Sequence, residues 1–112
     1  MRYIPCTIQS FRCKSEDTWI ISVPFDAVKN ASERFTELLS GTRRNIVFLD
    51  SKTEFTITAD SAICSGRRIP ITKDFLECLK KLFSSDIQPG KSHLDYDFSD
   101  RCGDVTITVL VV

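Results

Sequence analysis

Apolar residues recur at every second position in several segments of the chain, the pattern of a strand with one buried face. Two such segments lie near the C-terminus, over residues 93–98 and 105–111, and a Cys102-Gly103 turn between them predicts an antiparallel hairpin. A second hairpin is predicted near the N-terminus, from residues 3–13 and 18–23. The apolar face changes within 3–13, which favours a bulge near Gln9-Ser10.

The middle of the chain predicts further strands. Residues 45–50 contain a continuous apolar run, typical of a strand covered on both faces. Residues 53–59 alternate, with Phe55, Ile57 and Ala59 expected to face inward. A turn at Ser65-Gly66 precedes a short strand expected over 68–71.

Two segments have helical spacing instead. Residues 26–40 carry one apolar stripe, with Asp26 as the expected N-terminal cap and Gly41 as a left-handed residue after the last turn. Residues 73–84 carry a second stripe, and Thr72 is expected to cap that helix.

These elements predict an α+β fold, with a mainly antiparallel sheet of about six strands and two amphipathic helices packed on one face. We treat residues 1–112 as a single domain, because 112 residues is close to the commonest domain size. Hydrophobic residues make up 42% of the chain, which is enough to form a core, and Trp19 is expected to belong to it.

Charge and cysteine content narrow the class of protein. Fifteen basic residues balance fifteen acidic ones, so the basic excess typical of nucleic-acid binding is absent and no direct nucleic-acid partner is expected. No signal sequence and no membrane-spanning apolar run is visible, which predicts a cytoplasmic protein without a membrane partner. The five cysteines are expected to be free thiols in a reducing compartment.

Catalytic and cofactor motifs are sparse. One histidine and four scattered glycines exclude a three-histidine zinc site and a glycine-rich phosphate loop, and no cofactor or metal is expected. His93 and Asp95, with Cys102 or a nearby serine, offer a Cys-His-Asp or Ser-His-Asp group, the basis of a less favoured hydrolase or nuclease hypothesis. Cys64 could be a reactive thiol only through the nearby Arg67 and Arg68.

Charged residues cluster at three places in the sequence. The pairs Arg43-Arg44 and Arg67-Arg68 could contact an anion but are more typical of turns. Four aspartates lie close together near the C-terminus: Asp95, Asp97, Asp100 and Asp104. Asp95, Asp97 and Asp100 could bind a divalent cation, but their spacing lacks the loop, glycine and glutamate of a calcium-binding loop, so a solvated or partner-facing acidic edge is favoured over a metal site.

The segment from Ile69 onward, IPITKDFLECLKKLFSS followed by DIQPGKSHLDYDFSDRCGDVTITVLVV, resembles small immunity proteins of bacterial polymorphic-toxin and contact-dependent growth inhibition systems. The resemblance is carried by a leucine-rich helix, a strand beginning His-Leu-Asp-Tyr and a final aliphatic strand. It implies a cytoplasmic protein that binds one cognate toxin domain and blocks it. The family pattern often has a second histidine near His93, where this chain has Lys91-Ser92.

We therefore expect an immunity protein that neutralises a toxin by stoichiometric protein–protein interaction, without catalysis. Many such toxins have basic clefts, so an acidic edge is expected to be complementary to them. The expected binding residues are His93, Asp95, Asp97, Asp100 and Asp104. The alternative in the same class is an adaptor or homodimer formed through an exposed sheet edge.

Overall fold

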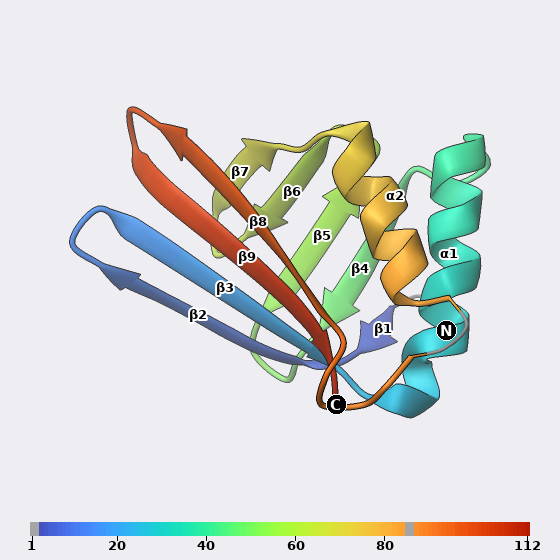
Figure 1. Cartoon of the computed structure of the whole chain (residues 1–112). Coiled ribbons are helices and arrows are strands. Elements are labelled where there is room, and N and C mark those ends of the chain that lie inside the picture. The colour runs from blue at the N-terminus through green and yellow to red at the C-terminus, as the bar shows by residue number, and fades with distance from the viewer. Residues whose placement is uncertain (1–2, 85–86) are drawn as a thin grey trace.

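In a computed structural model, which describes residues 3–84 and 87–112, the chain forms two β-sheets and two α-helices around a common core (Figure 1). The elements are β1 (Ile4–Pro5), β2 (Thr7–Cys13), β3 (Glu16–Val23), a 3-10 turn (Phe25–Ala27), α1 (Val28–Ser40), β4 (Asn45–Leu49), β5 (Glu54–Thr58), β6 (Ser61–Cys64), β7 (Arg67–Pro70), α2 (Lys73–Leu82), β8 (His93–Asp100) and β9 (Gly103–Val111).

The strands divide into two sheets. Sheet A has the order β1-β4-β5-β6-β7, and sheet B has the order β2-β3-β9-β8. In Figure 1 sheet B lies in front of sheet A, and the two helices lie side by side at one end of the molecule. Most neighbouring strands are antiparallel, but β1 pairs with β4 and β3 pairs with β9 in parallel.

The predicted α+β class is confirmed, and most strand pairs are antiparallel as expected, but the single sheet of about six strands is wrong. The described residues contain nine strands in two mixed sheets. Sequence pattern misses the parallel pairs because no short turn joins parallel strands, so nothing local marks them. The strand β6 was also missed, because it is short and its buried residues show no clear alternation.

The N-terminal segment was predicted as one bulged strand, and this is also wrong. Its two parts belong to different sheets: Ile4 lies opposite Phe48 in sheet A, whereas β2 pairs with β3 in sheet B. The chain crosses between them at Cys6, whose N–H donates to the Leu49 carbonyl. The register of β2 is unbroken over Thr7–Cys13, so this segment has no bulge. The apolar pattern switches face at Phe11 because Phe11 is an apolar residue on the solvent-exposed side of β2.

Aromatic side chains join the two sheets and the helices. Trp19 of sheet B meets Phe55 of sheet A edge-on, with ring centroids 6.2 Å apart. Phe35 of α1 packs on Phe48 of sheet A and stacks on Phe83, which directly follows α2. The core is therefore shared by the facing sides of both sheets and by both helices, and the expected core position of Trp19 is confirmed.

Two local predictions hold and three fail. Gly41 has φ +84°, and the Thr72 hydroxyl accepts a hydrogen bond from the Phe75 N–H, as expected for the two helix ends. Asp26 makes no capping hydrogen bond, because a 3-10 turn over Phe25–Ala27 precedes α1. Ala59 is exposed. Strand β4 alternates between buried and half-buried residues, so only one face of it is fully covered.

Asp50 fixes the point where the chain enters sheet B. Its Oδ2 atom accepts a hydrogen bond from the Ile8 N–H at 2.9 Å, and its Oδ1 atom accepts from the N–H and the hydroxyl of Ser51. These hydrogen bonds, led by the one from Ile8, lower the pKa of Asp50 below its ordinary value.

Gly103 lies where the two hairpin turns of sheet B touch. Its φ is +112°, and a Cβ atom there would lie 2.0 Å from the Ser15 carbonyl oxygen. That carbonyl accepts a hydrogen bond from the Asp104 N–H at 2.9 Å, so the close approach is part of the β3–β9 pairing. Only glycine both adopts this positive φ without strain and leaves room for the Ser15 carbonyl.

We expect Gly103→Ala to lower the free energy of unfolding by about 2–4 kcal/mol, because backbone strain and a steric clash add. Gly41→Ala is the matched control, since Gly41 also has positive φ but nothing within 4 Å of the added Cβ. It should cost only about 1 kcal/mol. Chemical denaturation measures both, and equal losses would contradict the clash with Ser15.

We expect Asp50→Asn to reduce the loss of the free energy of unfolding that occurs as the pH is lowered into the acidic range. A carboxyl whose pKa is lowered on folding stabilises the protein above its unfolded pKa of about 4, and that contribution is lost as pH falls through the folded value. Urea denaturation between neutral and acidic pH measures this, with Glu33→Gln on the exposed side of α1 as control. An acid limb identical in the two variants would refute the role of Asp50.

Candidate protein-binding surface

Sheet B has one face in the core and one face open to solvent. Along each of its strands, the residues that alternate with the core residues are exposed or half-buried, and none is buried. We call these positions the outer face. They are Thr7, Gln9, Phe11 and Cys13 on β2, Glu16, Thr18, Ile20 and Ser22 on β3, Asp104, Thr106, Thr108 and Leu110 on β9, and His93, Asp95, Asp97 and Ser99 on β8.

The outer face is acidic. It carries the carboxylates of Glu16, Asp95, Asp97 and Asp104, and no lysine or arginine occupies any of its positions. The whole chain has zero net charge, so these carboxylates are balanced by an equal basic excess elsewhere. The protein is therefore neutral overall but presents a negative surface on one side.

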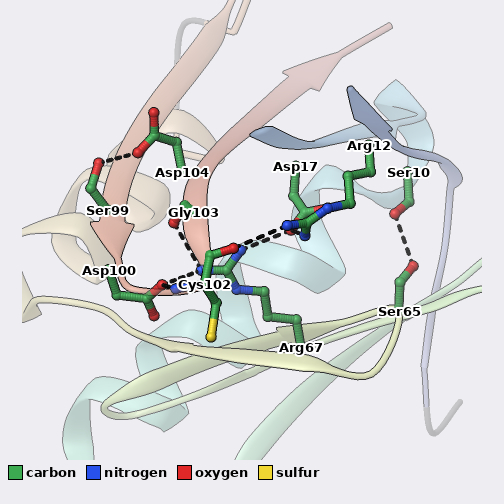
Figure 2. A network of polar contacts seen from close by, with 10 residues as sticks. All are labelled: Ser10, Arg12, Asp17, Ser65, Arg67, Ser99, Asp100, Cys102, Gly103 and Asp104. Atoms are coloured by element: carbon green, nitrogen blue, oxygen red, sulfur yellow. Dashed lines mark hydrogen bonds and ion pairs between the residues drawn. The ribbon is translucent and has the colours of Figure 1, made fainter. Parts of the chain in front are cut away.

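Hydroxyl groups on neighbouring strands hold three of these carboxylates. Thr108 donates to Asp95 at 2.7 Å and Thr106 donates to Asp97 at 3.0 Å, both across the β8–β9 ladder. Ser99 donates to Asp104 at 2.6 Å, pointing away from the core as Figure 2 shows. Each hydrogen bond limits the side-chain freedom of its carboxylate, so a cationic partner would meet carboxylates that are already ordered.

His93 extends this row at the start of β8. Its Nε2 atom lies 3.9 Å from Asp95 Oδ2, and both side chains are more than half exposed. A pair this exposed contributes little to stability. His93, Asp95, Asp97 and Asp104 thus share one surface, as the sequence predicted.

Asp100 does not belong to that surface, although the sequence grouped it with the others. Its Oδ1 atom accepts a hydrogen bond of 2.6 Å from Arg67, which projects from sheet A. It also accepts from the Cys102 N–H at 2.8 Å. Asp100 lies opposite Gly103 and, by the alternation of β8, faces sheet A.

Arg67 joins sheet A to three strands of sheet B (Figure 2). Besides Asp100, it donates to Asp17 on β3 at 2.8 Å and to the Gly103 carbonyl at 3.0 Å. Arg12 on β2 completes the group, with 2.8 Å to the same Asp17 oxygen and 3.0 Å to the Cys102 carbonyl. The hydrogen bond to Asp17 is the main reason that the pKa of Arg67 is raised.

This network removes Arg67 as a candidate anion site, because its donors are already directed at protein acceptors. Arg43 is paired with Glu37 at 3.4 Å. Arg44 and Arg68 remain exposed side chains.

The structure does not assemble the Cys-His-Asp group. His93 and Cys102 lie at opposite ends of the β8–β9 hairpin, and β8 alone spans about 23 Å at about 3.3 Å per residue. The three aspartates considered for a cation are also separated, since Asp100 faces sheet A. No cluster of three potential metal ligands occurs among residues 3–84 and 87–112.

The cysteines are free thiols in two environments. Cys13, Cys78 and Cys102 are exposed, whereas Cys64 is buried and Cys6 is half-buried. Burial raises the pKa of Cys64 and, together with nearby Asp50, raises that of Cys6 to about 12. A raised pKa and burial both disfavour the thiolate, so the structure gives no support to Cys64 as a reactive thiol.

The residues of the outer face that the sequence did not single out include Thr106, Thr108 and Glu16. Thr106 and Thr108 were recognised only as polar positions in a strand, although the hairpin register would have placed them opposite Asp97 and Asp95. Glu16 gave no usable signal, because it joins Asp104 only through the parallel pairing of β3 with β9.

A hollow elsewhere in the described chain is separate from this surface. It has a volume of about 560 Å³ and lies beside the start of α1, where Phe25, Val28 and Phe83 line it. The outer face is a sheet surface, which suits a protein partner better than a small molecule.

Comparison with known proteins adds no relative: no protein-family model, curated protein or solved structure matches the chain. Within the described part, no helix is long and apolar enough to cross a membrane.

We expect Arg67→Met to lower the free energy of unfolding by about 2 kcal/mol, because Asp17 and Asp100 lose charged hydrogen bonds and the Asp17 side chain is mostly buried. Arg68→Met is the matched control, since Arg68 is the next residue of β7 and is exposed. The Arg68→Met substitution should change the free energy of unfolding by no more than about 0.5 kcal/mol. Urea denaturation compares them, and similar losses would contradict the role of Arg67.

Proposed function

We propose that this chain is an immunity-type inhibitor, which binds a cognate toxin domain stoichiometrically and blocks it without catalysis. The observation that carries the proposal is the ordered carboxylate row on the outer face of sheet B. The resemblance of the segment from Ile69 onward to immunity proteins supplies the biological context.

The charge of the outer face defines the chemistry of the partner. Four carboxylates on a face that has no lysine or arginine at its strand positions favour a basic protein surface, such as the substrate cleft of a nuclease. Such complementarity accelerates association and rejects acidic partners. The binding residues that we propose are Glu16, His93, Asp95, Asp97 and Asp104, with Asp100 assigned instead to the network around Arg67.

The hydrolase alternative loses its best candidate group. Its proposed nucleophile, Cys102, lies at the opposite end of the hairpin from His93. His93 has two long, exposed contacts, to Asp95 at 3.9 Å and to the Lys91 carbonyl at 3.4 Å, and they leave it without the close, buried partner that orients a catalytic base. Binding is therefore the function that the described geometry supports best.

The first experiment is growth rescue in bacteria. The toxin candidate is the C-terminal domain of the protein encoded by the adjacent upstream gene, expressed with this chain or with an unrelated immunity protein. Rescue by this chain alone would support a specific inhibitor. A toxic domain that this chain does not neutralise would reject the proposal for that pair.

Given a rescued toxin, we expect the Asp95→Asn/Asp97→Asn double variant to bind it at least about tenfold more weakly, with a smaller salt dependence. Asparagine keeps an oxygen that can accept from Thr108 and Thr106 but removes the charge. Titration calorimetry at low and high salt measures this.

The control is Asp60→Asn/Asp74→Asn, which removes two exposed charges away from the outer face. This variant should retain the affinity of the unmodified chain. Equal binding by both double variants would exclude the outer face while leaving the inhibitor function intact.

A further inference from the structure

The two sheets have four outer edges, and three of them are unsuited to pairing with another copy of the chain. Strand β1 has only two residues, one of them Pro5. Strand β7 has four residues, including Arg67, Arg68 and Pro70. Strand β8 is longer, but an antiparallel copy would set its aspartates beside one another. Short strands, prolines and like charges are the usual protection of a sheet edge.

Strand β2 has none of these protections. It is seven residues long, contains no proline and no acidic residue, and its one charge, Arg12, is paired with Asp17. In Figure 1 it forms the free margin of sheet B, with β3 on its other side.

The backbone of β2 shows which groups face outward. The Ile8 N–H donates to Asp50 instead of to β3, so Ile8 belongs to a pair that is not hydrogen-bonded across the ladder. Because the two kinds of pair alternate in an antiparallel ladder, the N–H and C=O groups of Ser10 and Arg12 also point away from β3. Asp50 occupies the edge at Ile8, which leaves Ser10 to Arg12 as the open part.

An exposed aromatic side chain lies within this open part. Phe11 is 53% exposed on the outer face, and its diagonal neighbour on β3 is Ile20, which is half-buried. Large apolar side chains at the margin of an uncovered sheet mark an interaction site more often than scattered ones do.

From these observations we infer that β2 pairs with β2 of a second copy of this chain, antiparallel about a twofold axis at Phe11. Ser10 of each copy then lies opposite Arg12 of the other, and their outward groups form four backbone hydrogen bonds. The two Phe11 side chains meet as a directly opposed pair on the outer face, an arrangement that stabilises antiparallel sheets.

Charge favours the second copy as the occupant. The β2 segment is self-complementary, because the paired residues Ser10 and Arg12 bring no like charges into contact and Arg12 is neutralised within its own copy. The joined sheet would have the order β8-β9-β3-β2-β2-β3-β9-β8. Its carboxylate rows lie at the two far ends, so dimerisation and the proposed toxin binding use different strands and can fail independently.

Sedimentation equilibrium of the full chain in reducing buffer, up to about 1 mM, tests the association. We expect a monomer–dimer equilibrium in the micromolar range, since the interface is small. Phe11→Glu should abolish the dimer by placing two carboxylates at the axis. Phe25→Glu is the matched control, because Phe25 is 55% exposed and lies outside sheet B, and it should leave the equilibrium unchanged. A monomer at all concentrations, or a dimer unaffected by Phe11→Glu, would overturn the inference.

A cross-link tests the register. Pairing about Phe11 sets Gln9 opposite Cys13 of the other copy in a pair that is not hydrogen-bonded, at a Cα separation of about 4.5 Å, within disulfide range. Gln9→Cys should therefore give a covalent dimer with oxidised glutathione. The same substitution combined with Cys13→Ser should not. Cross-linking that persists without Cys13, or none with it, would overturn the proposed register.

Discussion

The hydrogen-bonded group around Arg67 is the interaction on which the arrangement of the two sheets depends. One guanidinium from sheet A contacts Asp17, Asp100 and the Gly103 carbonyl, which belong to three strands of sheet B. Asp17 and Arg67 are both mostly buried, and each carboxylate has a charged donor, so the cost of removing the charges from water is offset. The group lies where both hairpin turns of sheet B meet, beside the only residue type that fits between them, glycine at 103.

Aromatic packing continues from this polar end into the core. Trp19 and Phe55 join the sheets, and Phe35 and Phe83 join the helices to them. With sheet A, the helices and the Arg67 network on one side of sheet B, the opposite side is left open. That asymmetry makes the outer face available to a partner. Because successive side chains of a strand point to opposite faces, the residues of the outer face can be charged while those of the core face stay apolar.

The two proposed interactions follow from two features of the same sheet. Its carboxylates lie on β8, β9 and β3, and threonine and serine hydroxyls donate to the three on β8 and β9. Its unprotected edge is β2, at the opposite margin, where Phe11 is exposed and backbone groups face outward. An inhibitor built in this way would present one acidic surface per copy, and two copies would present them at the ends of one continuous sheet.

The sequence alone determined the local elements: the C-terminal hairpin, the Thr72 cap, the left-handed Gly41 and the apolar stripes of both helices, since each depends on residues close together in the chain. It also placed His93, Asp95 and Asp97 on one face of a strand, because strand alternation is a local rule. Tertiary structure alone decided the division into two sheets, the parallel pairs and the separation of Asp100 from the other aspartates. These depend on contacts such as Arg67 with Asp17 and Ile4 opposite Phe48, between residues dozens of positions apart, which no local pattern records.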